Sequence, residues 1–106
     1  MIETVAIEPA ARALLDAEAL RCAEAAVEWA KRRAAAYRVA FEGARIWHWR
    51  SLEDSSVGEA VLEVTVRGHP DDALAFSGAV SAYLGELTGR CPSPAVDRLA
   101  VSVQWR

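Results

Sequence analysis

The chain has 106 residues, of which 53% are hydrophobic and 25% are charged, and its formal net charge is −3. This composition is typical of one globular domain over residues 1–106, because a chain of this length can bury a core without disulfides or metal, and it argues against intrinsic disorder. The acidic balance argues against nucleic acid as a partner, since the one basic run, residues 31–33, lies on a predicted helix that also carries Glu24 and Glu28.

The expected lack of a targeting signal and the small number of cysteines point to a cytoplasmic protein. Residues 1–9 are acidic and lack an apolar segment, so we expect no signal peptide. No apolar run approaches the ~20 residues that cross a bilayer, so we expect no membrane partner. Cys22 and Cys91 lie far apart in the sequence without a CxxC spacing, and we interpret both as reduced thiols.

The first third of the chain contains a short strand and a long helical segment. Residues 2–7 are rich in β-branched side chains and are ended by Pro9, which predicts a strand. Residues 9–36 contain no glycine or internal proline, which is typical of a helix. A single helix of this length would span ~42 Å, so we expect either a break near Asp16, which can cap a second helix, or an overhanging end. The predicted buried stripe is formed by Leu20, Ala23, Val27, Ala30 and Ala34.

The next segment changes from helical to strand periodicity. Apolar and polar side chains alternate over residues 37–50, which predicts a strand interrupted at Gly43. Gly43 forms either a bulge or, together with Glu42, a tight turn. Unbroken, this strand would reach ~46 Å, against ~20 Å for an ordinary strand. We therefore expect the hairpin of residues 44–60 to project beyond the helices or to bend back at Gly43.

The C-terminal half repeats the pattern of strand, helix and strand. Alternation predicts strands over residues 59–67 and 98–105, each with one apolar face. Residues 69–90 predict a helix, because a proline and two aspartates occupy its first turn. Gly78 and Gly85 within this helix suggest a close approach to the sheet or to another helix.

The predicted element order is β-α-β-β-α-β, an α+β fold. The simplest packing is an antiparallel sheet with two helices on one face, the ferredoxin-like arrangement. In that arrangement the first and third strands are central, and the second and fourth strands form the edges. If Glu42 and Gly43 form a turn instead, the fold becomes a long helix on a curved antiparallel sheet, as in cystatin-like or NTF2-like folds.

Two of the four tryptophans occur in the segment RIWHWRS, residues 45–51. Trp47 and Trp49 share one face of the predicted strand, and grouped exposed aromatic residues mark interfaces, so we expect a homodimer or larger oligomer that contacts here. Two alternatives stay open: the rings belong to the core, or they stack on a planar anionic small molecule that the neighbouring arginines pair with. The candidate ligand or interface residues are Arg45, Trp47, His48, Trp49, Arg50 and Trp105.

Catalytic and metal-binding signals are weak. The two histidines, His48 and His69, do not form a ligand set with cysteines or carboxylates at recognisable spacing, so we expect no metal and no cofactor. No phosphate-binding, nucleophile-elbow or zinc-protease motif occurs. An enzyme would have to use His48 with Glu53, Asp54 or Glu59 in a cleft between subunits.

These observations favour a non-catalytic oligomeric module that binds a small molecule or a partner protein on the open face of its sheet or at a subunit interface. Ferredoxin-like regulatory modules such as ACT domains work in this way, which is an analogy of topology alone. The two hypotheses differ in where they place His48. An enzyme needs this histidine in a pocket facing a carboxylate, whereas a binding module leaves it at the surface and covers Trp47 and Trp49 with another chain.

Overall fold

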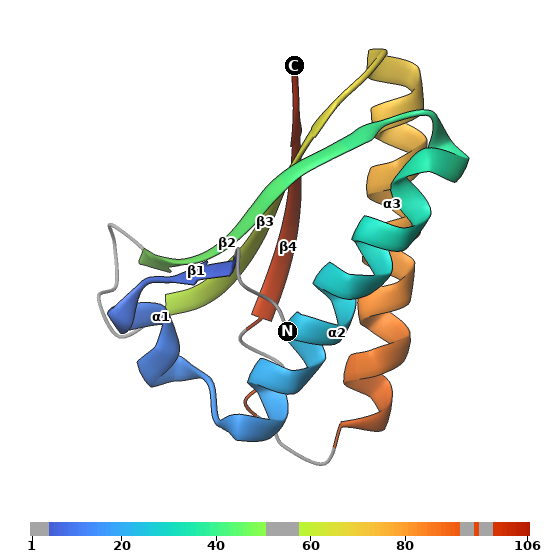
Figure 1. The fold of residues 1–106 in the computed structure, drawn as a ribbon. Helices are drawn as coiled ribbons and strands as arrows, with labels where there is room; N and C mark the ends of the chain where they lie inside the picture. The colour runs from blue at the N-terminus through green and yellow to red at the C-terminus, as the bar shows by residue number, and fades with distance from the viewer. Residues whose placement is uncertain (1–4, 51–57, 92–94, 96–98) are drawn as a thin grey trace.

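A computed structural model describes residues 5–50, 58–91, 95 and 99–106 of the chain. Within these residues one four-stranded sheet carries three α-helices on one face, an α+β architecture (Figure 1). In chain order the elements are β1 (Val5–Ile7), α1 (Pro9–Leu14), α2 (Ala17–Arg33), the short 3-10 helix η1 (Ala34–Tyr37), β2 (Ala40–Arg50), β3 (Gly58–Arg67), α3 (Pro70–Arg90) and β4 (Leu99–Trp105).

The predicted helix of residues 9–36 breaks where the sequence indicates. Asp16 is the N-cap of α2, and its Oδ1 accepts a hydrogen bond from the Ala19 N–H at 2.9 Å. This bond satisfies one of the N–H groups that the first turn of a helix leaves without a partner. The break leaves α1 as a separate short helix, so α2 does not overhang the sheet as a single long helix would.

The second strand starts later than predicted. Residues 34–37 form η1, and Arg38 ends it in the left-handed conformation with φ 62°, which turns the chain into β2. The register with β3 shifts between Phe41 and Gly43. Gly43 therefore belongs to a β-bulge, one of the two alternatives, and the turn at Glu42 and Gly43 is wrong.

The strand order differs from the prediction. The sheet runs β1-β2-β3-β4, with β1 parallel to β2, β2 antiparallel to β3, and β3 parallel to β4. The ferredoxin-like arrangement is wrong, because β2 and β3 are central and the sheet is mixed, and the cystatin-like or NTF2-like antiparallel sheet is wrong for the same reason. Each half of the chain is a β-α-β unit whose two strands are parallel neighbours, and one hairpin joins the halves.

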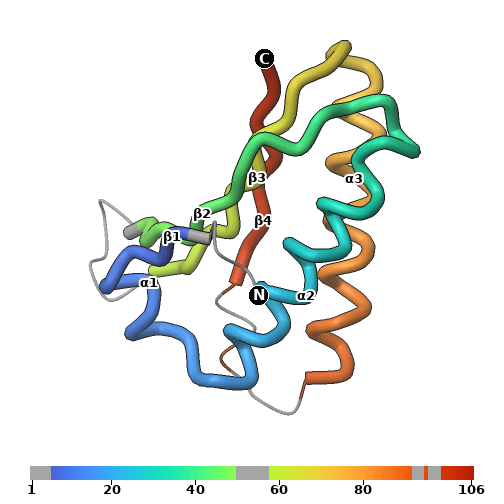
Figure 2. The backbone as a smooth tube through the Cα atoms, viewed as in Figure 1, coloured from blue at the N-terminus to red at the C-terminus, as the bar shows by residue number. Residues whose placement is uncertain are grey.

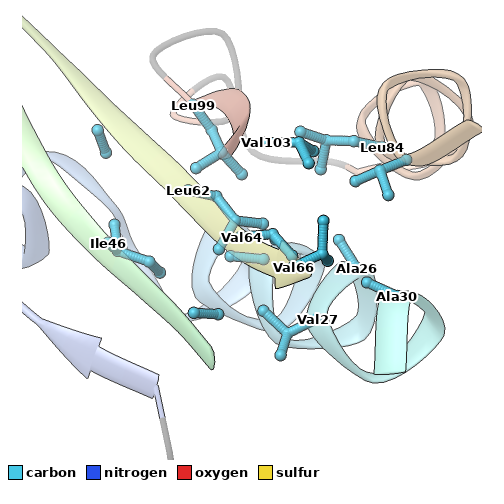
Figure 3. Close-up of a cluster of buried hydrophobic side chains, with 14 of the residues drawn as sticks. Ala26, Val27, Ala30, Ile46, Leu62, Val64, Val66, Leu84, Leu99 and Val103 are labelled. Atoms are coloured by element: carbon cyan, nitrogen blue, oxygen red, sulfur yellow. The ribbon is translucent and has the colours of Figure 1, made fainter. Parts of the chain in front are cut away.

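The core lies between the sheet and the helix layer. Alternate residues of β3 and β4 point into it, and α2 and α3 contribute small residues beside Phe76, which is fully buried. Figure 3 shows Ile46 of β2, Leu62, Val64 and Val66 of β3, and Val103 of β4 facing Val27 of α2 and Leu84 of α3. The predicted stripe is confirmed, since Ala23, Val27 and Ala30 of α2 and Ala34 of η1 are buried, and Leu20 is partly buried against the same core.

The helix pair is antiparallel and is held at its outer side by aromatic stacking. Figure 2 shows α2 and α3 running side by side in opposite directions. Trp29 of α2 stacks on Tyr83 of α3 with ring centroids 4.6 Å apart, and the Arg33 guanidinium lies 5.8 Å from the Trp29 ring. The expected close approach at Gly78 and Gly85 is wrong for this chain, because a Cβ at either position would meet no atom within 4 Å.

The described part of the β2–β3 hairpin is covered by a helix of its own chain. The short helix α1 packs against both strands, and β1 pairs with β2 over Ala44–Ile46. Ala11 of α1 is fully buried in the same cluster as Ile46. The expectation of an uncovered hairpin is wrong because the break at Asp16 lets the first helical segment cover this end of the sheet.

Candidate binding surface

One face of the sheet carries no described helix. Its side chains come from alternate positions of β2, β3 and β4, because successive residues of a strand point to opposite sides. We call this surface the open face; its residues are Arg45, Trp47, Trp49, Glu59, Val61, Glu63, Thr65, Ala100, Ser102 and Gln104. Figure 1 shows the helices on the other side of the sheet.

A small apolar cluster lies in the middle of the open face. The register places Trp47 opposite Val61, and Val61 opposite Ala100 on β4. Val61 is buried yet stands outside the main core cluster. Trp47 is half-buried, and its indole Nε1 is buried without a hydrogen-bond partner. Burial of this N–H without an acceptor among the described residues is unfavourable, and because the chain's own atoms cover Nε1, a partner on the open face would contact the ring of Trp47 rather than its N–H.

The two other predicted tryptophans are more exposed than Trp47. Trp49, also on the open face, is 44% exposed, and Trp105 at the end of β4 is 45% exposed. The alternation of β4 assigns Trp105 to the helix-covered side rather than to the open face. The structure therefore brings Arg45, Trp47 and Trp49 together and separates Trp105 from them; the side chain of Arg50 lies outside the described part.

The cations of the open face and of the adjoining bulge form ion pairs within the described part of the chain, whereas Glu59 of this face is exposed. The Arg45 Nε donates to the Glu63 Oε2 at 2.8 Å, and this bond raises the pKa of the Arg45 guanidinium further. At the bulge, Glu42 pairs with Arg67 at 3.0 Å and with Arg106 at 2.9 Å. The surface has no array of unpaired cations of the kind that attracts phosphates.

The hollows beside Arg45 are shallow. One measures about 200 Å³ and is bounded by Glu42, Glu63 and Arg106, and the other measures about 220 Å³ and is bounded by Ile7 and Trp47. Sites for small molecules usually measure ~300–1,000 Å³ and enclose most of the ligand. Both hollows beside Arg45 are smaller than this range.

The structure describes two residues of the predicted enzyme site, His48 and Glu59, and places them on opposite sides of the sheet. His48 is half-buried on the helix-covered side of β2, where its ring packs against Gly58. Glu59 lies opposite Trp49 and points to the other side of the sheet. Glu53 and Asp54 lie outside the described residues, and the described part holds no cluster of three or more metal-ligating side chains.

The free edge of β4 is a second surface feature. Among the residues that the structure describes, Leu99–Trp105 pairs only with β3, and its sequence LAVSVQW has no charge, proline or glycine. Its pairing with β3 is regular over all seven residues, so no bulge bends the edge away. Edge strands usually carry one of these features, since their unpaired N–H and C=O groups invite another strand. The fourth strand lies at an edge of the sheet, as predicted, and the absence of charge, proline, glycine and bulge along it can be recognised only once this position is known.

The structure also brings together two residues that sequence separation had set apart. Cys22, near the start of α2, and Cys91, which follows α3, line one hollow of about 210 Å³. Burial, and then the Cys91 side chain, raise the pKa of Cys22 from 9.0 to about 11. Sequence spacing carries no signal for this pair, because the antiparallel packing of α2 and α3 creates it.

Neither the helices nor the comparisons with known proteins point to a further class of site. No helix among the described residues is both long and apolar enough to pass through a bilayer. Compared with known proteins, the chain matches no family model, no curated protein and no solved structure.

Proposed function

We propose that this chain is a non-catalytic module that assembles with a second copy of itself through β4 and binds a partner protein on its open face. The observation that supports the assembly is the unprotected edge of β4. Seven consecutive residues without charge, proline, glycine or bulge present their outer backbone groups to any strand that can align with them.

The sequence of β4 is complementary to itself. A two-fold axis perpendicular to the sheet gives an antiparallel pair, and the register that uses all seven residues has its centre at Ser102. Leu99 then faces Trp105 of the second copy, and Val101 faces Val103, both pairs on the helix-covered side. This places an apolar neighbour beside the exposed indole of Trp105, which is 45% exposed in the single chain.

On the other side of this strand pair, small and uncharged residues meet. Ala100 faces Gln104 of the second copy, and Ser102 faces its own equivalent. No like charges are opposed within the paired seven residues, and Arg106, which follows them, is held by Glu42 of its own chain at 2.9 Å. The result is an eight-stranded sheet with all helices on one side, and the two open faces form one continuous surface.

The open face of this dimer would bind a protein rather than a small molecule. Trp49, which is 44% exposed, offers a ring for stacking beside the half-buried ring of Trp47. A screen of metabolites by thermal shift should therefore give no stabilisation, whereas a reproducible shift by one metabolite would contradict this assignment. We place the module in the cytoplasm, where structural disulfides are rare and a thiol pair is ordinarily held in the reduced state.

A charge swap at Ser102 tests the assembly, because only this residue faces its own copy. Ser102→Lys and Ser102→Glu should each weaken self-association by about tenfold, since each opposes two like charges across the axis. An equimolar mixture of Ser102→Lys and Ser102→Glu should restore association, because a lysine of one chain then faces a glutamate of the other. Association is measured by sedimentation equilibrium, and folding of each variant is checked by circular dichroism.

Thr65→Lys is the matched control. Thr65 lies on the open face of β3, opposite Gln104, but is one strand away from the free edge. This variant should associate like the wild type. If Thr65→Lys dissociates the assembly as strongly as Ser102→Lys, or if the mixture of Ser102 variants stays monomeric, pairing through β4 is wrong.

A further inference from the structure

We propose that Cys22 and Cys91 form a reversible disulfide that ties the start of α2 to the end of α3. The two helices are antiparallel neighbours, so the beginning of one and the end of the other lie at the same end of the helix layer (Figure 2). Both thiols line the same hollow of about 210 Å³, which is open to solvent and has Arg21 and Arg90 at its rim. This inference is independent of the proposed assembly, because the cysteines lie on the helix layer and β4 lies in the sheet.

Local packing positions both thiols at this junction. The Cys22 Sγ lies 4.0 Å from the carbonyl oxygen of Leu87, in the last turn of α3. Cys91 is the C-cap of the same helix, and its backbone N–H donates to the Thr88 carbonyl at 3.3 Å. Both side chains are half-buried, so a small oxidant can reach them while the helices keep them near each other.

A low-molecular-weight disulfide such as oxidised glutathione supplies the oxidising equivalents. In the first exchange, the thiolate of one cysteine attacks a glutathione sulfur, a mixed disulfide forms, and one reduced glutathione leaves. In the second exchange, the other cysteine attacks the protein sulfur of the mixed disulfide and releases a second reduced glutathione. The protein loses two electrons and two protons, which reduce one glutathione disulfide to two thiols.

Either thiol can react first with the soluble disulfide, and the proximity of the other thiol then promotes the second exchange. Burial, and then the Cys91 side chain, raise the pKa of Cys22 to about 11, so this thiol is protonated at neutral pH and its exchange is faster at higher pH. The resulting bond closes a long stretch of chain, which restricts the unfolded state and favours the native one.

Oxidised glutathione is the probe for the test. The reduced, folded chain should close the Cys22 to Cys91 bond, seen as a loss of about 2 Da in intact mass and as one crosslinked peptide after proteolysis. Closure should be at least about tenfold faster in buffer than in concentrated urea, because only the fold holds the thiols together. The oxidised chain should melt ~10 °C or more above the reduced chain, and dithiothreitol should reverse the change.

Cys22→Ser and Cys91→Ser are the matched controls. Each variant should stop at a single glutathione adduct, without the increase in melting temperature. The proposal is overturned if the folded wild type accumulates glutathione on both cysteines, or if the bond forms no faster in buffer than in urea.

Discussion

Gly68 and Gly85 show how residue environment decides the effect of one added methyl group. A Cβ at Gly68 would lie 2.9 Å from the Val39 Cγ1 and 3.3 Å from the Arg38 carbonyl oxygen, and Val39 is buried. Gly68→Ala should therefore lower the free energy of unfolding by about 1–3 kcal/mol. Gly85→Ala should raise it by about 0.5–1 kcal/mol, because its Cβ points into open space on α3 and alanine favours helix.

Urea denaturation of the three proteins at one protein concentration checks this pair of predictions. The concentration must be fixed, because self-association contributes to apparent stability. Equal stability of the two variants, or stabilisation by Gly68→Ala, would contradict the packing at the junction of β3 and α3.

The thiol of Cys22 gives a pH-dependent prediction. Burial and Cys91 raise its pKa from 9.0 to about 11, so the folded state favours the protonated thiol. The stabilisation from this group is fully present below pH 9.0 and disappears as the pH rises to about 11. Under reducing conditions, the wild type should lose more stability across this window than Cys22→Ala. Parallel stability curves for the two proteins would show that Cys22 does not lie in the environment described.

At the scale of elements, Asp16 separates α1 from α2. Asp16→Ala should lower the free energy of unfolding by about 1 kcal/mol, because it removes the cap on the Ala19 N–H. Asp16→Asn keeps a side-chain oxygen at the same place and should lose clearly less. A loss in Asp16→Asn as large as in Asp16→Ala would mean that the carboxylate charge, rather than the cap, stabilises this junction.

The helices and strands could be predicted because their signals are local. The cap at Asp16, the stripe on α2 and the alternation of β3 each depend on residues a few positions apart, and all three are confirmed. The strand order could not be predicted in this way. Both a ferredoxin-like sheet and the observed one satisfy β-α-β-β-α-β, and the choice depends on which strand each crossover places beside β2.

In the candidate site, too, the features that depend on neighbouring residues could be predicted, and the features that depend on strand register or helix packing could not. Alternation predicted that Trp47 and Trp49 share a face, but the side chains opposite them depend on the register of the hairpin. That register places Glu59 on the opposite side of the sheet from His48, so their nearness in sequence was misleading. The pair of Cys22 and Cys91 depends on helix packing, for which spacing in the sequence gives no signal.

In the proposed dimer, two copies of the chain contact each other through β4, whereas the sequence led us to expect this contact at β2. The segment with Trp47 and Trp49 lies on β2, two strands away from β4. Trp49→Ser should therefore leave the mass of the particle unchanged while it removes a ring from the partner surface. Dissociation of Trp49→Ser into monomers would instead support the original expectation that these tryptophans form the contact between copies.

If β4 of one chain pairs with β4 of a second copy, the wild-type protein is a dimer in solution, and its native mass shows this. Light scattering coupled to size exclusion, at high micromolar concentration and under reducing conditions, should give twice the 11.5 kDa of a single chain. A mass of 11.5 kDa over the whole accessible concentration range would contradict the account.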